Sequence, residues 1–372
     1  MNSVKIGALV ALLPVVLATG VDMTAAQPAP KARARDLGLG TVIGGRSGAL
    51  DAITDVAGVE VGVTTLIEGE GPLVVGKGPV RTGVTIVHPR GRTNADPVFG
   101  AWFSLNGNGE MTGTTWLQEG GYLEGPIGIT NTHSVGVVRD AILHWQASRP
   151  GLQPWGLPVV AETYDGELND INGFHVKPEH VFAALDKASA GPVPEGNVGG
   201  GTGMRCLGFK AGTGTASRVL AAEAGGYTVG VLVQCNFGLR QDLRVAGVPV
   251  GEELTDLRPC IAIADPKIRP ELPRCDAPAA VRSPRDEQES GSIIVVVATD
   301  APLLPHQLKR IATRVSLGVG RAGGFSGNGS GDIFVAFSTA NPRSATADAP
   351  TRVEMVPNDR MNPLFVATVQ AT

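Results

Sequence analysis

The feature that most constrains this chain is a serine placed directly before an uninterrupted apolar run. Ser292 follows Gly291 and precedes residues 293–298, whose sequence is IIVVVA. An apolar run with no polar alternation is typical of a strand that is buried on both faces. The preceding residues 282–290, RSPRDEQES, are polar and charged, which is typical of an exposed loop. The sequence therefore predicts a hydroxyl at the boundary between an exposed loop and a core strand.

This boundary has two interpretations. In the first, Ser292 Oγ attacks the Gly291 carbonyl, and hydrolysis of the resulting ester leaves Ser292 with a free α-amine. Such an amine has an ordinary pKa of about 7.7–8, which suits a general base for the hydroxyl of the same residue. In the second, Gly-Ser only ends a loop before a strand. Taken alone, these residues favour the second interpretation.

A second hydroxyl lies near the start of another apolar run. Ser330 has a glycine on each side, which lets the backbone turn tightly and approach a ligand closely. Asp332 is two residues further on, so in an extended segment both side chains point the same way. The apolar residues 333–337 follow directly. If the strands after Ser292 and around Ser330 are neighbours, the three side chains converge.

Several segments resemble one family in the same order along the chain. GSIIVVVATDAPLLPHQLKRIA (291–312) and GNGSGDIFVAFSTAN (327–341) resemble the second chain of the L-aminopeptidase/D-amidase-esterase and β-aminopeptidase family, which are self-processing serine hydrolases with an N-terminal nucleophile. The upstream matches are AITDVAGVEVG (52–62), FSLNGNGEMTG (103–113), GPIGITNTHSVG (125–136), AETYDGELNDI (161–171), GNVGGGTGM (196–204) and VGVLVQCNFG (229–238). Motifs in register from about residue 50 to about residue 341 are far more specific than any one of them.

The resemblance implies a fold and a processing event. It implies a four-layer α/β/β/α sandwich with two sheets face to face, whereas the sequence pattern alone does not distinguish this from a doubly wound sheet. It also implies self-cleavage between Gly291 and Ser292, giving chains 27–291 and 292–372 of one catalytic domain. A homotetramer of such two-chain units is implied as well.

The resemblance also assigns roles at two strand ends. Glu162 would hold the substrate's α-ammonium and Tyr164 would place an aromatic hydroxyl near the reacting carbonyl; without the resemblance, Glu162 is better explained as a solvated carboxylate. Asn236 would stabilise an oxyanion, a contribution of several kcal/mol when the donor is preorganised. The alternative is an ordinary turn asparagine before Gly238.

Further assignments concern the base and the pocket. Ser330 and Asp332 would tune the Ser292 amine, although the family acid is Glu, one methylene longer than Asp332. Gly200 and Gly201 would form a wall of the substrate pocket, where side chains would obstruct. A phosphate-binding loop is a weak alternative, because the segment lacks the Lys-Ser/Thr of a P-loop and the dinucleotide-binding spacing.

Residues 1–26 are predicted to be a signal peptide. Lys5 provides a basic start, residues 6–17 are apolar, and Thr24-Ala25-Ala26 suits cleavage before Gln27. We expect residues 27–372 to be exported, periplasmic or secreted, and free of the membrane after cleavage; a retained N-terminal anchor is the alternative. The formal net charge of −4 argues against a nucleic-acid partner.

The remaining pattern predicts clustered strands and a few helices. Strands are expected at 59–63, 82–87, 98–105, 127–130, 157–162 and 227–235, and helices at 134–148, 178–189 and 213–224. Clusters of strands with helices favour a layered arrangement over a barrel.

The cysteines fall into two pairs. Cys206 and Cys235 lie in apolar surroundings and are interpreted as small core residues. Cys260 and Cys275 flank a Pro- and charge-rich segment, and export makes a bridge between them plausible, although spacing cannot show that the geometry permits it. The sequence has no HExxH or CxxC motif, so we expect no metal and no cofactor.

The predicted function is a self-processing serine aminopeptidase that releases small L-, D- or β-amino acyl residues from short peptides, amides or esters. Two alternatives stay open. One is another amide hydrolase or acyl transferase on the same scaffold, for instance one acting on pantetheine-like amides. The other is a non-catalytic exported binding protein that is never cleaved.

Overall fold

The computed structural model describes residues 32–152, 154–254, 256 and 290–372. The predicted signal peptide, the cysteines Cys260 and Cys275, and residues 282–289 of the predicted loop lie outside these residues. Within the described part of the chain, no helix is both long and apolar enough to cross a membrane.

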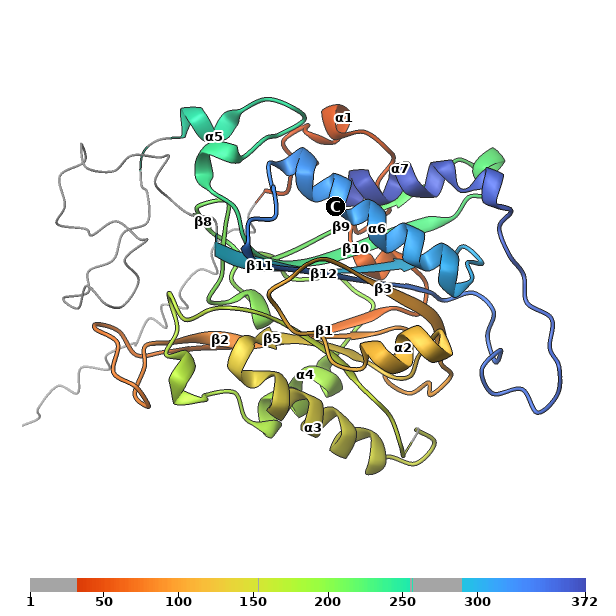
Figure 1. Cartoon of the computed structure of the whole chain (residues 1–372), viewed down its shortest axis with the longest axis horizontal. Coiled ribbons are helices and arrows are strands. Elements are labelled where there is room, and N and C mark those ends of the chain that lie inside the picture. The colour runs from red at the N-terminus through yellow and green to blue at the C-terminus, as the bar shows by residue number, and fades with distance from the viewer. Residues whose placement is uncertain (1–31, 153, 255, 257–289) are drawn as a thin grey trace, which may run out of the picture.

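Two β-sheets face each other and helices cover both outer faces (Figure 1). The four-stranded sheet has the order β1 (Glu60–Glu68), β2 (Val80–His88), β5 (Ile127–Asn131) and β6 (Val159–Thr163). The six-stranded sheet has the order β4 (Tyr122–Leu123), β3 (Val98–Gly107), β12 (Gly329–Ser338), β11 (Ser290–Thr299), β10 (Thr228–Asn236) and β9 (Thr213–Val219).

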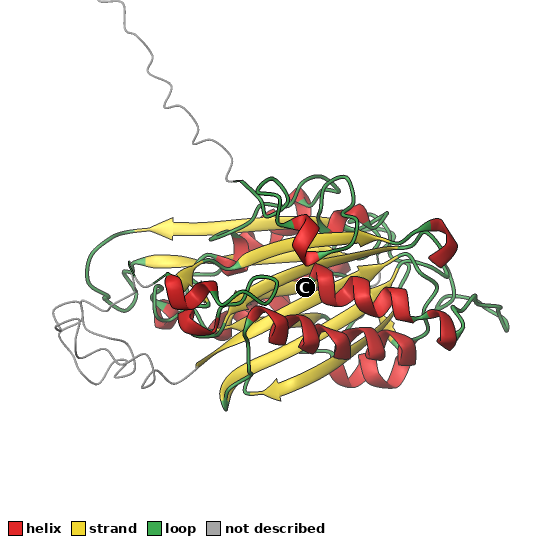
Figure 2. Cartoon of the chain, turned by 90° about the horizontal axis from the view of Figure 1, so that it is seen from above, coloured by secondary structure: helices red, strands yellow, loops and turns green. Residues whose placement is uncertain are grey.

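Four helices form the two outer layers. Helices α3 (Val135–Ala147) and α4 (Pro178–Lys187) pack on the four-stranded sheet, and α6 (Pro305–Ala322) and α7 (Asn362–Ala371) pack on the six-stranded sheet. Seen from above, the helices of the upper layer lie side by side over the strands (Figure 2). The shorter elements are α1 (Gly40–Ile43), α2 (Thr114–Gly120), α5 (Val250–Glu253), and the two-stranded β7 (Arg205–Cys206) and β8 (Phe209–Lys210). The predicted α/β/β/α order is confirmed.

Strand β11 contributes side chains to the hydrophobic cores on both faces of the six-stranded sheet. Ile293, Val295 and Val297 pack toward α6 and α7. Ile294, Val296 and Ala298 pack between the two sheets. Because successive side chains point to opposite faces of a strand, both sets of β-branched residues are buried, as the sequence predicts.

The predicted helix at 213–224 is wrong. Residues Thr213–Val219 form the edge strand β9, and only Ala222–Ala224 make a short 3-10 turn. Thr215 Oγ donates to Val231 O on β10 (2.7 Å) and accepts from Ile53 N (2.8 Å). The alanines favour a helix locally, but β-branched residues and pairing with β10 decide the structure.

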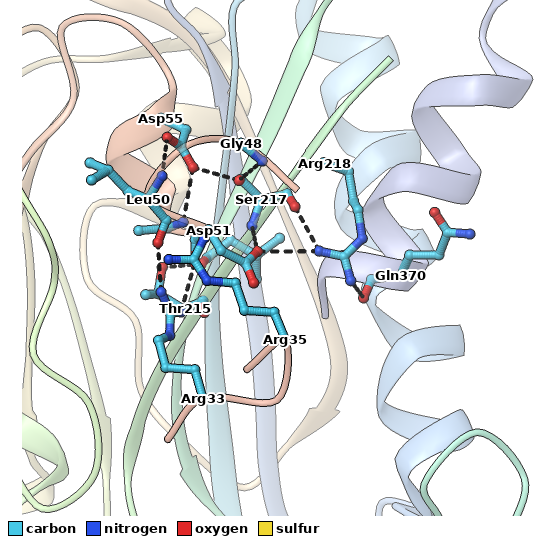
Figure 3. Close-up of polar contacts among 12 residues, drawn as sticks. Arg33, Arg35, Gly48, Leu50, Asp51, Asp55, Thr215, Ser217, Arg218 and Gln370 are labelled. Carbon is cyan, nitrogen blue, oxygen red and sulfur yellow. Dashed lines mark hydrogen bonds and ion pairs between the residues drawn. The ribbon is translucent and has the colours of Figure 1, made fainter. Parts of the chain in front are cut away.

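The N-terminal segment covers the outer edge of β9 (Figure 3). Arg33 donates to Thr215 O (2.7 Å) and Leu50 O (2.6 Å). Arg218, on β9, contacts Asp51 Oδ1 (3.4 Å) and donates to Gln370 O on α7 (3.2 Å). An exposed strand edge is a template for unwanted pairing, so this network protects the end of the six-stranded sheet.

The interpretation of Cys206 and Cys235 as separate core thiols is also wrong. The two residues form a disulfide, with Cα atoms 5.4 Å apart. Strand β7 lies beside the end of β10, where Leu207 N donates to Phe237 O (2.7 Å). Their separation of 29 residues in the sequence concealed this contact.

Candidate active site

The candidate residues lie at one end of the two facing sheets, on neighbouring strands. Strand β11 pairs in parallel with β12, and Ser292 lies opposite Gly331. On its other side β11 pairs antiparallel with β10, and Ser292 lies opposite Asn236. The structure therefore meets the condition on which the convergence of Ser292, Ser330 and Asp332 depended.

The hydroxyl of Ser292 lies against the peptide bond that precedes it. Ser292 is 4% exposed, and its Oγ donates to Gly291 O over 2.7 Å. A side chain on Gly291 would place its Cβ 1.9 Å from Asn236 O. Only glycine allows the β10 backbone to approach this closely, so the residue before Ser292 is fixed by packing.

Ser330 and Asp332 form a buried pair beside this junction. Ser330 Oγ donates to Asp332 Oδ1 over 2.6 Å, so the shorter acid reaches the serine. Burial raises the pKa of Asp332, which is 1% exposed, and hydrogen bonds from Ser330 and Ser326 oppose the rise. In this uncut chain, no side-chain hydrogen bond of the described residues joins the Ser292 hydroxyl to either member of the pair.

Two asparagines at the end of β3 position this pair, and sequence reasoning missed them. Asn106 Nδ2 donates to Gly327 O (2.6 Å), and Asn108 Nδ2 donates to Gly329 O (2.8 Å). A β-bulge at Leu105 shifts the register of β3 against β12 at this point. Bulges are common beside active sites because they redirect side chains. The repeated Asn-Gly of FSLNGNGEMTG was the signal.

Glu162 is buried beside the same strands and is not the solvated carboxylate of the alternative interpretation. It lies in β6 and is 3% exposed. Its Oε1 accepts from Glu110 N (3.0 Å), and its Oε2 accepts from Thr132 Oγ. Burial raises the pKa of Glu162, while these two hydrogen bonds lower it. A Cβ on Gly109 would lie 3.3 Å from Oε1 and 3.1 Å from Gly331 Cα, which places the carboxylate next to β12.

Asn236 is the last residue of β10, not a turn residue, and its side chain is held at both ends. Its Nδ2 donates to Tyr164 O (2.7 Å), and its Oδ1 accepts from Arg205 N (3.0 Å). Tyr164 thus contacts Asn236 through its backbone. The phenol of Tyr164 lies over Gly166, where an added Cβ would be 2.3 Å from the hydroxyl oxygen.

Gly200 and Gly201 lie in a short 3-10 turn between the two sheets. A Cβ on Gly200 would lie 2.1 Å from Gln234 Oε1, and one on Gly201 would lie 2.4 Å from Thr213 N. Close backbone packing therefore explains the glycines. Their role as a wall of the substrate pocket stays a prediction.

One buried acid behind the site was also missed. Asp165 follows Tyr164, is 0% exposed, and accepts from Asn169 Nδ2 over 3.0 Å. Burial raises its pKa to about 7, although Thr82 and Asn169 oppose the rise. Its position directly after the AETY strand end was the available signal. Among the described residues, no group of three His, Cys, Asp or Glu side chains is placed to hold a metal ion.

A family model described as Peptidase family S58 matches residues 51–372. The chain belongs to peptidase family S58. This S58 peptidase is 56% identical over 363 residues to the β-peptidyl aminopeptidase BapA of Sphingosinicella microcystinivorans, a match that covers 96% of this chain and 87% of that protein.

Solved structures of similar proteins share the fold. One is the L-aminopeptidase D-Ala-esterase/amidase from Ochrobactrum anthropi, described as a prototype for the serine aminopeptidases and a new variant among the Ntn hydrolase fold (46% identity, TM-score 0.78, 92% of this chain and 88% of that one). Another is a β-aminopeptidase from Burkholderia sp. (48% identity, TM-score 0.76, 91% and 88%). The S58 peptidase is therefore a serine aminopeptidase of the N-terminal-nucleophile type. These matches do not favour a pantetheine-type hydrolase, an acyl transferase or a non-catalytic binding protein.

Proposed function

We propose that this S58 peptidase cuts itself between Gly291 and Ser292, and that the new N-terminal serine then removes small N-terminal residues from short peptides, amides or esters. The observation that carries the proposal is the Ser292 hydroxyl, buried and 2.7 Å from the oxygen of the Gly291 carbonyl. The packing of Gly291 against Asn236 O supports the proposal, because it holds the scissile peptide bond in place beside this hydroxyl.

Self-cleavage would begin at this contact. Ser292 Oγ attacks the Gly291 carbonyl carbon, the C–N bond breaks, and the proton of the hydroxyl passes to the released nitrogen. Water then hydrolyses the Gly291 ester, which frees a carboxylate on Gly291 and the Oγ–H of Ser292. The α-amine left on Ser292 has an ordinary pKa of about 7.7–8 and serves as the base in later turnovers.

In turnover, Ser292 Oγ would attack the first peptide carbonyl of the substrate. Its α-amine, whose basicity the Ser330–Asp332 pair adjusts, takes the proton and returns it to the leaving amine. Water then hydrolyses the acyl ester, which releases the amino acid and restores the Ser292 hydroxyl. Asn236 donates one N–H to Tyr164 O, and an amide NH₂ has a second N–H to offer. We assign that second N–H to the oxyanion, together with the Tyr164 phenol.

Glu162 would hold the substrate's free ammonium. A buried carboxylate is costly without a cation, and the raised pKa of Glu162 reflects that cost. The substrate's ammonium would supply a charge-assisted partner, since none of the described residues forms an ion pair with Glu162. Two relatives are named as β-aminopeptidases, so we include β-amino acyl residues among the substrates.

The test is the intact mass of purified protein. We expect a chain that begins at Ser292 and ends at Thr372. Ser292→Ala should remain one chain and be inactive on alanine p-nitroanilide. Ser148→Ala, on the exposed end of α3 far from the junction, should process and turn over like the wild type. A Ser292→Ala protein that still yields two chains would show that another protease makes the cut.

Export, assembly and the second cysteine pair remain parts of the proposal. The predicted signal peptide supports cleavage before Gln27 and a periplasmic or secreted location. The family resemblance supports a homotetramer of two-chain units, which light scattering would measure. Non-reducing peptide mapping would show whether Cys260 and Cys275 are bridged.

A further inference from the structure

A cavity with basic walls is lined by Arg205, whose backbone N–H donates to Asn236 Oδ1 (3.0 Å). Its volume is about 360 Å³, and its lining includes Arg205, Phe209, Lys210 and Arg240. Arg240 is already occupied, because it donates to Gly208 O (2.6 Å) and Asp256 O (2.5 Å) and lies over the Phe209 ring. Arg240 therefore forms a fixed side of the cavity, and Arg205 and Lys210 form the other side, which we call the open side.

The open side carries two cations directly opposite each other. Arg205 on β7 pairs with Lys210 on β8 in the antiparallel register. Like charges opposite each other destabilise a strand pair, so this arrangement favours an anion between them. Arg205 Nε forms an ion pair with Glu167, but its Nη atoms make no hydrogen bond within the described residues. Lys210 is exposed and forms no ion pair there.

The contacts of Glu162 and Arg205 place the ammonium anchor and this cavity beside different neighbours of the nucleophile strand. Glu162 lies next to Gly331 on β12, Ser292 is on β11, and Asn236 is on β10. In the six-stranded sheet β9 follows β10, and the separate β7–β8 pair lies beside the end of β10, where Leu207 N donates to Phe237 O and Arg205 N donates to Asn236 Oδ1 (3.0 Å). A substrate whose ammonium meets Glu162 and whose carbonyl meets Ser292 therefore extends its leaving group toward Arg205.

We propose that Arg205 and Lys210 bind the terminal carboxylate of the leaving group, so that the enzyme prefers short peptides with a free C-terminus over their amides. This inference rests on the proposed function, because it needs Ser292 as nucleophile and Glu162 as ammonium anchor. Glu167 and Asp256 bring negative charge near the cavity, and the two cations with Arg240 exceed it. The guanidinium fork suits a carboxylate in bidentate geometry.

The experiment compares β-alanyl-alanine with β-alanyl-alaninamide on the purified, two-chain enzyme. The quantity measured is the ratio of kcat/KM for the acid to kcat/KM for the amide. Arg205→Met and Lys210→Met should each lower this ratio, Arg205→Met by roughly tenfold, since hydrogen bonds to charged groups are worth at least that factor. The loss should appear mainly in KM for the acid, and added salt should reduce the wild-type ratio.

Two further variants separate substrate binding from a structural ion pair. Glu167→Gln removes the ion pair but leaves Arg205 in place, so the ratio should stay or rise if Arg205 binds substrate. A Glu167→Gln enzyme that loses the ratio as Arg205→Met does would overturn the proposal. Lys187→Met, an exposed charge change at the end of α4, is the matched control and should leave the ratio unchanged.

The proposal also fails if the ratio is the same in the wild type, Arg205→Met and Lys210→Met. That result would leave the aminopeptidase mechanism intact, provided that the enzyme still prefers a free amine. A wild-type enzyme that shows no preference for a free amine would instead refute the role of Glu162.

Discussion

Asp165 should make the stability of this protein depend on pH in a way that one substitution removes. The carboxyl is fully buried behind the active site, and burial raises its pKa from 3.8 to about 7. A change of this size corresponds to about 4 kcal/mol between the two protonation states. Asp165→Asn keeps the shape and an acceptor for Asn169 but has no charge at any pH.

The direction follows from proton binding. Below pH 3.8 the carboxyl is protonated in both states, so its stabilisation of the fold is complete. As the pH rises toward 7, the unfolded chain ionises while the folded chain keeps its proton, so the free energy of unfolding falls. Above pH 7 both states are ionised, and about 4 kcal/mol has been lost.

The assay is equilibrium urea unfolding of Ser292→Ala with and without Asp165→Asn, so that both proteins stay as one chain. All other titrating groups are shared and cancel in the difference. The stability of the Asn variant relative to its parent should rise by about 3 kcal/mol between pH 4.5 and 8 and then level off. A difference that does not change with pH would refute the reasoning, because any lost hydrogen bond contributes equally at every pH.

Three further outcomes test the junction, the anchor and the disulfide. Gly291→Ala places a Cβ 1.9 Å from a backbone oxygen, so self-cleavage, measured by intact mass, should slow by roughly a hundredfold. Gly136→Ala, whose Cβ meets nothing within 4 Å, should process normally. N-acetylalanine p-nitroanilide should turn over far more slowly than the free-amine compound, and Glu162→Gln should shrink that preference without blocking self-cleavage; equal turnover by the wild type would remove the anchor. Cys206→Ser should lower the free energy of unfolding by roughly 3 to 4 kcal/mol in the chain-entropy model, and a peptide map with Cys206 and Cys235 both free would contradict the bond.

The apolar runs predicted the core well because an uninterrupted run of apolar residues indicates a strand that is buried on both faces. The strand after Ser292 needs hydrophobic surroundings on both faces, and only a central strand between two layers provides them. The family resemblance predicted the layer order, which periodicity alone left open. It could not supply the hydrogen bonds: Ser330 Oγ donates to Asp332, whereas among the described residues the Ser292 hydroxyl donates to Gly291 O and to neither of them before the chain is cut.

The wrong predictions came from features that depend on distant partners. Alanine-rich residues 213–224 favour a helix by propensity, yet Thr213–Val219 form a strand because they pair with the edge of β10. The disulfide joins residues 29 positions apart, a spacing with no local signature. Arg205 was missed for the same reason, because its significance lies in Lys210 opposite and in the cavity between them.

The strand order determines how the two chains of the cleaved enzyme would be held together. From one edge the six-stranded sheet runs β4, β3, β12, β11, β10 and β9. A cut after Gly291 would assign β12 and β11 to the second chain while β3 and β10, on either side, belong to the first. Neither polypeptide would then hold the complete six-stranded sheet, whereas the first would keep all of the four-stranded sheet.

Once cut, the enzyme would dissociate slowly and would refold poorly after denaturation. The second chain would be wedged between strands of the first and held by ladders on both sides, so separation requires breaking both ladders together. A denatured mixture would have to reassemble two polypeptides at a rate that depends on concentration, with bare strand edges inviting aggregation. The working lifetime of the mature enzyme would therefore be set by how slowly it unfolds, not by a reversible equilibrium.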